Sequence, residues 1–460
     1  MLIGFSLCNY KSFNEVQTIS FIASKVIRHK DHIIENNNKR ILKSGLIFGA
    51  NASGKSNLIE AIDFSRKIIL YDIEKVNTVK SYFRINNDAY KQPGIFDYRI
   101  IVEGNEYSYG IAISYVKKEI IGEWLTQIDE KGNEIYLFNR EIDEQGIYHT
   151  STEFKNLNTE EDLKLNFYLD GFGENISDSY KKKTILNDIA LRTNEIDGFF
   201  GTIKKIYNWF DNLTIIFPTS KFLGTNEYSG IEEVREVFSK TISFFDTGIE
   251  TVENTKEQFN FDKILDHSND INVDKIKTEI YNAVKSNPVR FKFNNQIYIL
   301  KQDDNGNIVY NKMLLNHGNK NDLFEFADES DGTKRLFDLI PLFYLKKECP
   351  TILIDEIDRS LHTNLTKKFI EMFFSLTKNT NCQIIATTHD TNLLDLDIFR
   401  QDEIWFIERQ KDHSSKLYSL NKFKARFDKK IDKDYLLGRY GAIPIFNNNN
   451  FLEEIYEEQI

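Results

Sequence analysis

Residues Gly49 to Ser56 have the types and spacing of a phosphate-binding loop. Their sequence, GANASGKS, matches G-x-x-x-x-G-K-[S/T] in full, follows the apolar GLIF and precedes a helical segment, which is the context the motif requires. In this pattern backbone N–H groups surround the α- and β-phosphates of a nucleotide. The lysine, Lys55 here, reaches the β/γ-phosphates, and the final hydroxyl, Ser56, binds Mg²⁺. The other predicted nucleotide contacts are Gly49, Asn51, Ala52, Ser53, Gly54 and Asn57.

Two adjacent carboxylates follow a second apolar segment. In TILIDEID, residues 351–358, Asp355 and Glu356 come at the end of a predicted strand. Neighbouring side chains on a strand point to opposite sides, so one carboxylate can serve a metal ion while the other faces a γ-phosphate. We therefore expect Asp355 to hold Mg²⁺ and Glu356 to act as general base on a water molecule. Without the phosphate loop, a solvated strand end would be the simpler interpretation.

A histidine follows a third apolar segment. His389 lies in ATTHD, directly after the strand-like QIIAT. A single histidine in such a place is commonly structural, but beside the two motifs above it can hydrogen-bond the γ-phosphate and sense its hydrolysis. Lys55, Glu356 and His389 are therefore the predicted catalytic residues.

The segment ESDGTKRL, residues 329–336, is a second candidate for phosphate binding. A glycine-containing turn that opens a helix offers unpaired N–H groups and the positive end of the helix dipole to an anion. An apolar stripe turns this polar helix start outward, and Pro341 is expected to kink the helix. The stripe consists of Leu336, Leu339, Ile340 and Phe343. Because one phosphate loop already holds its own nucleotide, this helix start could cap the nucleotide of a neighbouring subunit.

The composition indicates a globular protein of a reducing compartment. Hydrophobic residues make up 41% of the 460 residues, and 59 Lys and Arg stand against 70 Asp and Glu, a net charge of −11. That balance argues against a surface that coats nucleic acid nonspecifically, although a local basic groove remains compatible with it. Three scattered cysteines, Cys8, Cys349 and Cys382, indicate buried thiols rather than a disulfide or zinc framework. Neither a signal peptide nor a membrane-length apolar run is evident, so we expect a cytoplasmic protein without membrane contact.

These motifs sit among elements of an α/β fold. Strands are expected within residues 1–48, an antiparallel meander at 95–149, and strands alternating with helices after residue 289, which predict a largely parallel sheet. The intervening residues have helical spacing, too broken for a long coiled coil, and include the strand-like NLTIIF. We predict an N-terminal lobe with the phosphate loop (1–150), a mainly helical insertion (151–290) and a C-terminal lobe with the other motifs (291–460).

The four motifs in this order resemble the ABC class of P-loop ATPases, in the branch that includes SMC, RecF and the overcoming-lysogenization-defect proteins. The resemblance implies an ABC-type fold that hydrolyses ATP with Mg²⁺ between two head-to-tail protomers. The signature, which closes on the ATP of the other protomer, would be Ser330, Gly332 and Thr333, with Asp358 in the D-loop and His389 at the switch position. The segment NYKSF (9–13) also resembles the first strand of this branch.

Further segments resemble the ATPase subunits of bacterial abortive-infection systems such as AbiL and PARIS. They are FRQDEIWFIER, LYSLNKF and YLLGRYGAIPIF (435–446). This resemblance implies an anti-phage ATPase, a homodimer or larger homo-oligomer, that holds a separately encoded toxic effector and releases it when a phage trigger protein is sensed. Fused members of the branch carry a Toprim nuclease after the ATPase. Because this chain ends at Ile460, we expect such a nuclease to be a separate polypeptide.

Several features fit the resemblance poorly. Asp331 stands where transporters carry a glycine, and neither Gln92 nor Ser220 fits the Q-loop position well. Residues 151–290 match no family pattern, and RYGAIP (439–444) has no chemical interpretation beyond a tightly packed turn.

Positive charges leave alternatives open. Lys181–Lys183 and KFKARFDKKIDK (422–433) could bind nucleic acid, but the net charge of −11 favours solvated faces. Lys334 and Arg335 could act in trans as an arginine finger does, or pair with the acids just before the signature. The main alternative function is a DNA-binding repair or recombination ATPase of the RecF/SMC kind, whose hydrolysis DNA would stimulate with a steep salt dependence. A structural ATP-binding protein without turnover is a third.

Overall fold

The computed structural model forms two compact units. Unit 1 comprises Met1–Pro218, Glu348–Asp358 and Lys367–Ile460, and unit 2 comprises Thr219–Lys347 and Arg359–Thr366. The residues that the structure describes are 1–37, 39–154, 159–219, 232–260, 273–285, 288–293, 296–303, 305–347, 351–423 and 430–444.

A six-stranded sheet carries the sequence motifs of unit 1. Its order is β11-β17-β18-β5-β19-β20, and the first five strands are parallel while β20 is antiparallel to β19. The strands are β11 (Thr214–Ile216), β17 (Thr351–Ile354), β18 (Gln383–Thr387), β5 (Ser44–Phe48), β19 (Ile404–Arg409) and β20 (Ser415–Ser419). Every residue of β17, β18 and β5 is buried, as expected for central parallel strands covered on both faces. This confirms the predicted parallel sheet.

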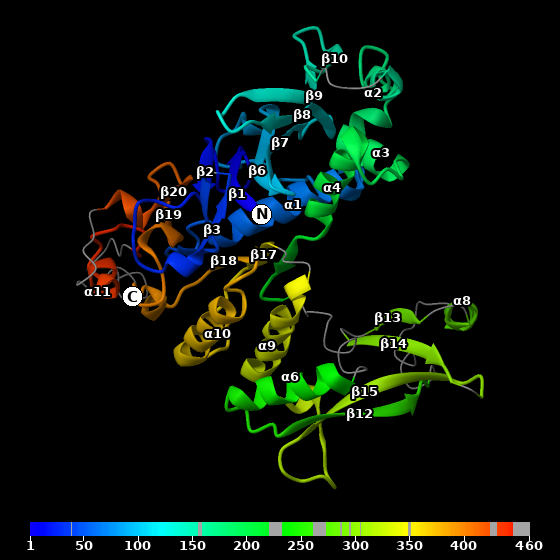
Figure 1. Ribbon diagram of the computed structural model, residues 1–460, viewed down its shortest axis with the longest axis vertical. Coiled ribbons are helices and arrows are strands. Elements are labelled where there is room, and N and C mark those ends of the chain that lie inside the picture. Colours follow the sequence, from blue (N-terminus) through cyan, green and yellow to red (C-terminus); the bar gives the residue numbers. More distant parts are fainter. Residues whose placement is uncertain are drawn as a thin grey trace, which may run out of the picture. The chain divides into compact units, whose positions relative to one another are not determined.

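A seven-stranded antiparallel sheet, in the order β10-β9-β8-β7-β6-β1-β2, forms the second layer of unit 1 and confirms the predicted meander. Its strands are β1 (Leu2–Cys8), β2 (Gln17–Ser20), β6 (Gly94–Val102), β7 (Asn105–Ser114), β8 (Glu119–Ile128), β9 (Glu134–Ile142) and β10 (Tyr148–Ser151). Helix α1 (Lys55–Tyr71) lies against β1 and β6 (Figure 1). One hydrophobic core joins both sheets through α1, since it includes Tyr98, Ile62 and Ile385. A short hairpin of β3 (Ile33–Asn36) and β4 (Lys39–Leu42) precedes β5.

Residues 151–290 are divided between the two units. Helices α2 (Thr159–Gly171), α3 (Ile185–Arg192) and α4 (Gly198–Asp211) belong to unit 1, where Phe210 and Ile203 enter the core next to α1. The segment NLTIIF supplies β11, the edge strand of the parallel sheet. Hydrophobic spacing predicts the type of these elements, but it does not reveal against which core each packs.

Unit 2 is built on an antiparallel sheet in the order β12-β15-β14-β13, with β16 paired to β15. Its strands are β12 (Thr251–Gln258), β13 (Val289–Phe293), β14 (Gln296–Gln302), β15 (Ile308–Asn316) and β16 (Phe324–Glu325). Its helices are α6 (Glu232–Phe244), α8 (Val273–Val284) and α9 (Asp331–Leu339). The predicted strands after residue 289 therefore exist, but the first three of them form this separate antiparallel sheet.

Helix α9 ends where a kink was predicted. The α-helix stops at Leu339 and continues as a 3₁₀ turn over Ile340–Lys347. Pro341 lacks the N–H that an α-helical turn requires and its ring clashes with the preceding carbonyl, so it ends the α-helix rather than bending it. The predicted apolar stripe of Leu336, Leu339, Ile340 and Phe343 is buried, as expected.

Two of the three cysteines are described. Cys382 is buried, and Cys8 is a half-buried free thiol whose pKa is raised by burial. Cys349 lies outside the described residues, as do Ser220 and residues 424–429 and 445–460. Among the helices that the structure describes, none combines the length and hydrophobicity of a membrane span.

Candidate nucleotide-binding site

The phosphate loop connects the carboxyl end of β5 to α1, as its motif predicts. Two of its positions have room only for glycine. A Cβ on Gly49 would lie 2.4 Å from the carbonyl oxygen of Ile407 in β19, and a Cβ on Gly54 would lie 2.3 Å from Ser415 Oγ. Gly54 also has φ of 111°, a conformation that disfavours side chains. The loop is therefore pressed closely against the β19–β20 hairpin.

Lys55 begins α1 and points back under the loop. Its Nζ atom donates to Gly49 O at 2.7 Å, Ala50 O at 3.1 Å and His389 Nδ1 at 3.3 Å, and only 5% of the residue is exposed. Burial lowers the pKa of Lys55 to about 8, while the charges of Asp355, Glu356 and Asp358 act in the opposite direction. Three predicted site carboxylates thus gather around one buried lysine.

Thr387, the last residue of β18, organises the two adjacent carboxylates. Its hydroxyl donates to Asp355 Oδ1 at 2.6 Å and accepts from the backbone N–H of Glu356 at 2.8 Å. Asp355 is only 3% exposed, whereas 30% of the Glu356 side chain is exposed. The two carboxylates do differ in environment, but strand alternation is not the reason. β17 ends at Ile354, and Glu356 has φ of 50°, which redirects its side chain.

His389 lies between the lysine and the predicted base. Because a lysine ammonium can only donate, His389 Nδ1 accepts from Lys55, and the ring proton of the neutral imidazole is on Nε2. That Nε2 atom is 3.6 Å from Glu356 Oε1. The carboxylate of Asp358 accepts from the backbone N–H of His389 at 3.3 Å, which fixes the turn after β18. The residues from the ends of β5, β17 and β18 meet at one edge of the sheet, where open α/β sheets bind ligands.

The remaining predicted loop residues differ in exposure. Asn51 and Ala52 are exposed, Ser53 is buried and Ser56 is half-buried. The amide nitrogen of Asn57 donates to Ser12 Oγ at 2.8 Å, so this side chain contacts the NYKSF segment. A serine hydroxyl at the helix start and the carboxylate of Asp355 are hard oxygen ligands, and this donor set fits Mg²⁺.

The signature candidate lies in unit 2. Ser330 is the N-cap of α9, and its Oγ accepts from the backbone N–H of Thr333 at 3.1 Å. A Cβ on Gly332 would lie 2.7 Å from Ser360 O, so the segment after TILIDEID requires glycine here. Ser330 is exposed, whereas Thr333 is 8% exposed and shares its hydroxyl with Ser330.

The cations after the signature have contacts of their own. Lys334 Nζ donates to Ala327 O at 2.8 Å, and Arg335 is 4% exposed, too buried to project into another subunit. The acids considered as their partners are engaged elsewhere: Glu329 pairs with His317 at 2.7 Å, and Asp328 accepts from the backbone N–H of Glu325.

The two Q-loop candidates lie in different places. Gln92 is exposed, and its carbonyl accepts from Asn9 of NYKSF. Ser220 lies outside the described residues, but the strand before it, β11, is the parallel neighbour of β17, and Ile216 O accepts from the backbone N–H of Asp355 at 2.8 Å. Residues 217–218 therefore follow β11 at the same edge of the sheet as Asp355.

RYGAIP is a packed turn against β19. The Tyr440 ring stacks on Phe406 with centroids 5.9 Å apart, and Tyr418 donates to Tyr440 O at 2.7 Å. The Ala442 N–H donates to Glu408 Oε1 at 3.2 Å. The segment thus supports the strand whose Ile407 presses on Gly49, as the packed-turn interpretation predicted.

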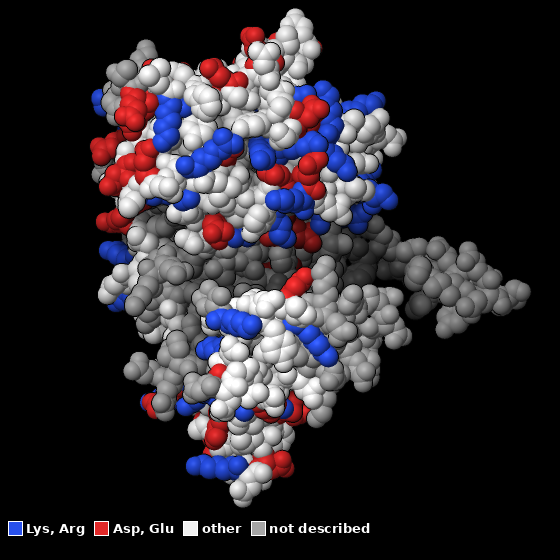
Figure 2. Space-filling view, turned by 90° about the vertical axis from the view of Figure 1, so that its right-hand side faces the viewer, with Lys and Arg blue, Asp and Glu red and all other residues white. Residues whose placement is uncertain are grey.

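Two lysines of the basic run Lys181–Lys183 pair with nearby acids. Lys181 pairs with Asp178 at 3.0 Å, and Lys182 pairs with Glu74. On the upper part of Figure 2, which is unit 1, blue and red groups alternate. The pairing of Lys181 and Lys182 therefore fits the solvated interpretation of this run better than a nucleic-acid groove.

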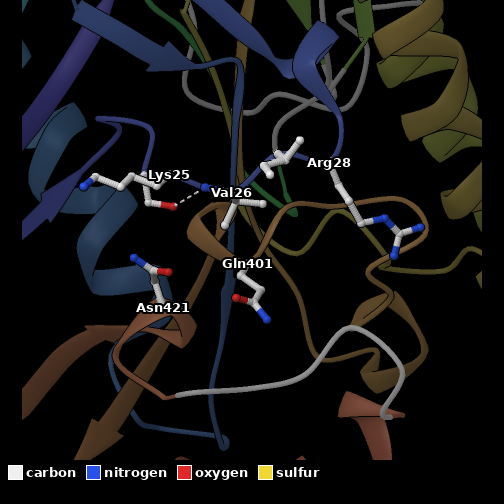
Figure 3. Close-up of a pocket in the computed structure, with 7 residues that line it drawn as sticks. Lys25, Val26, Arg28, Gln401 and Asn421 are labelled. Carbon is white, nitrogen blue, oxygen red and sulfur yellow. Dashed lines mark hydrogen bonds between the residues drawn. The ribbon is translucent and has the colours of Figure 1, made fainter.

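A cavity of about 540 Å³ lies at the opposite end of β19 from the phosphate loop. It is lined by Ser24, Lys25, Val26, Ile27, Arg28, Gln401 and Asn421 (Figure 3). Its wall is held by Arg400, fully buried, which pairs with both oxygens of Asp402 and donates to the carbonyls of Val26 and Arg28. The FRQDE segment is therefore a structural clamp.

Three residues that contact the predicted site are not predicted by the sequence patterns. Ser12 lies within NYKSF and Thr387 within ATTHD. Both segments have an interpretation from the sequence, but that interpretation assigns no role to these two residues. Ser415 lies in a polar turn, DHSS, that carries no recognisable motif. Its contact with the loop depends on the pairing of β19 with β20.

Comparisons with known proteins identify a family for this chain. Residues 46–395, well over half of the chain, match the family described as "AAA domain, putative AbiEii toxin, Type IV TA system". No curated protein matches. Similar solved structures include "SmcHead bound to the C-winged helix domain of ScpA" (16% identity, 91% of this chain and 97% of that chain, TM-score 0.36). Another is the SMC head domain from Thermotoga maritima (14% identity, 91% and 98%, TM-score 0.37). The chain therefore belongs to this AAA-domain family of the AbiEii type, and it is a P-loop enzyme that hydrolyses ATP.

Proposed function

We propose that this chain is the Mg²⁺-dependent ATPase of an anti-phage defence system. It holds a separately encoded toxic effector, a nuclease such as one of Toprim type, and releases it when a phage trigger protein is sensed. The family description, which names a toxin and a toxin–antitoxin system, supports the defence role. The observation that carries the enzymatic part is the chain of contacts from Lys55 through His389 to Glu356.

In this proposal each site residue has a defined task. The loop N–H groups and Lys55 bind the phosphates. Ser56 and Asp355 would hold Mg²⁺, which would supply positive charge next to the phosphates. Glu356 takes the proton of the attacking water. Lys55 orients His389 through one ring nitrogen, and the other ring nitrogen hydrogen-bonds the γ-phosphate and so senses its hydrolysis. Asp358 fixes the backbone turn after β18 that carries His389. Ser330, Gly332 and Thr333 of a second protomer cap the γ-phosphate.

A catalytic-base variant tests both the chemistry and the assembly. With Mg-ATP, Glu356→Gln should lose at least about a hundredfold in kcat, because general bases contribute roughly 10²–10⁴. Unable to hydrolyse ATP, it should remain an assembly of at least twice the 54.0 kDa chain mass, measured by light scattering. Glu371→Gln, an exposed carboxylate on α10 (Thr363–Leu376), is the matched control and should behave as the wild type.

The possible outcomes separate the parts of the proposal. Unchanged turnover in Glu356→Gln would overturn the base assignment. A monomer in every condition would overturn the composite site, and a stable oligomer without ATP would place assembly on other surfaces. For the defence role, cells carrying the chain with its neighbouring gene should resist phage, and Lys55→Ala should abolish the resistance. Equal plaque counts for cells with the wild-type chain and cells with Lys55→Ala would contradict that role.

A further inference from the structure

A chain of three hydrogen bonds runs behind the phosphate loop. Asn57 Nδ2 lies 2.8 Å from Ser12 Oγ, Ser12 Oγ lies 2.7 Å from Ser415 Oγ, and Ser415 Oγ lies 2.5 Å from the carbonyl oxygen of Ser53. Its members come from α1, the NYKSF segment, β20 and the loop itself. Ser415 is 3% exposed, so water does not compete for its hydroxyl.

The direction of this chain follows from which groups can donate. A carbonyl oxygen only accepts, so Ser415 must spend its single proton on Ser53 O. Ser12 Oγ, 2.7 Å away, is the other group within hydrogen-bond distance of Ser415 Oγ, and it accepts from the Asn57 amide. The backbone N–H of Ser415 also donates to Ser12 O at 2.7 Å and locks the two serines together.

The last bond of the chain fixes one peptide plane of the loop. The Ser53–Gly54 peptide is trans, so the Ser53 carbonyl and the Gly54 N–H point in opposite directions. With the carbonyl held at the back by Ser415, the Gly54 N–H is turned to the open side of the loop. Ser415 Oγ also occupies the place of a Cβ on Gly54, 2.3 Å away, so it sits directly behind this residue.

We propose that Ser415 is a positioning residue of the phosphate loop: by holding the Ser53 carbonyl, with Ser12 and Asn57 behind it, it aims the Gly54 N–H at a nucleotide phosphate. The inference rests on the proposed nucleotide binding by this loop. Ser12 and Ser415 both lie outside residues 46–395, the span of the family match. The elements that flank the matched domain therefore complete its phosphate site.

The test is ADP binding by Ser415→Ala, measured by calorimetry, with Ser414→Ala as the matched control. Loss of a buried hydrogen bond that leaves a carbonyl unsatisfied should weaken ADP binding by about tenfold. Ser414 belongs to the same turn, but its hydroxyl donates to Asp412 and should not matter. Because the contact aids ground-state binding, KM for ATP should rise while kcat changes by less than about threefold.

Ser12→Ala provides a second, independent variant. Ser12 reaches the Ser53 carbonyl only through Ser415, so its loss should be smaller, about threefold, and the double variant should bind ADP nearly as Ser415→Ala does. If Ser415→Ala does not fold, unchanged ADP binding by Ser12→Ala overturns the proposal. A lower melting temperature without weaker ADP binding also overturns it, because that would be a structural role alone. If the wild type itself fails to bind ADP, the proposed function falls, whereas equal binding by wild type and Ser415→Ala removes only this inference.

Discussion

At the scale of single residues, Lys55 is a buried amine whose pKa is lowered. Its burial lowers its pKa to about 8, although three carboxylates face it. A bound phosphate adds negative charge next to the ammonium and must raise that pKa again. Nucleotide binding is therefore coupled to the uptake of a proton near pH 8.

This coupling predicts that ADP affinity falls as pH rises through about 8. Above that pH the free enzyme holds Lys55 neutral, and each further pH unit should cost up to about tenfold in affinity. Calorimetric titrations with ADP in EDTA check this without any metal, and the second ionisation of a phosphate, near pH 6, lies outside the range. Buffers with different ionisation enthalpies should reveal the proton taken up. A flat affinity between about pH 7 and 9 would mean that Lys55 stays charged in the free enzyme.

The sequence predicts the residues of this site better than their supports. Motif and spacing predict Lys55, Asp355, Glu356 and His389, because each follows a strand end that a parallel sheet brings to one edge. Asp358 is predicted only by the family resemblance. Thr387 and Ser415 are not predicted, because the sequence around a serine or threonine does not indicate its role until its hydrogen-bond partner is known. That partner depends on the pairing of distant strands.

At the scale of elements, a buried ion pair in the antiparallel meander also contacts helix α3, which follows it in the chain. Arg140 of β9 and Glu123 of β8 are fully buried, with Nη2 3.0 Å from Oε2. The two oxygens of Glu123 also accept from the backbone N–H groups of Ile185 and Leu186 at the start of α3. Burial raises the pKa of Glu123, whereas the charge of Arg140 lowers it.

Glu123→Gln should therefore destabilise unit 1 by about 3–5 kcal/mol, because it leaves the buried Arg140 without a counter-charge. Urea unfolding followed by tryptophan fluorescence reports this unit, since Trp124, Trp209 and Trp405 all lie within it. Glu141→Gln, an exposed neighbour of Arg140, is the control and should change stability by less than about 0.5 kcal/mol. The double variant Glu123→Gln/Arg140→Met should recover part of the loss, and no recovery would argue against a charge effect.

The elements themselves were largely predictable, but their grouping was not. The alternation in GIFDYRIIV and the apolar run TILI indicate strands whatever surrounds them. In contrast, NLTIIF looks like an interruption of a helical region and is in fact the neighbour of β17, a pairing across more than a hundred residues. Local pattern contains no information about such a pairing.

At the scale of the whole molecule, the phosphate loop and the signature candidate lie in different units. Unit 1 contains Lys55, Asp355, Glu356 and His389, and unit 2 contains Ser330 and Gly332. In a head-to-tail dimer each site combines unit 1 of one protomer with unit 2 of the other. In such a dimer, a variant with a defective loop and a variant with a defective signature can together form one intact site.

Mixing two inactive variants should therefore restore ATP hydrolysis. Lys55→Ala disables the loop, and Ser330→Arg blocks the neighbour's nucleotide with a bulky cation. In a mixed dimer, one site carries both defects and the other carries neither. Random exchange makes about half of the dimers mixed, so the mixture should reach about one quarter of the wild-type rate per chain. Phosphate release from a one-to-one mixture measures it.

The matched control is a mixture of Lys55→Ala with Glu356→Gln. Both substitutions lie in unit 1, so a mixed dimer has one site without the lysine and one without the base, and neither is intact. Recovery with Ser330→Arg but not with Glu356→Gln requires that the signature acts across protomers. If neither mixture recovers although the variants exchange subunits, the signature does not act across protomers.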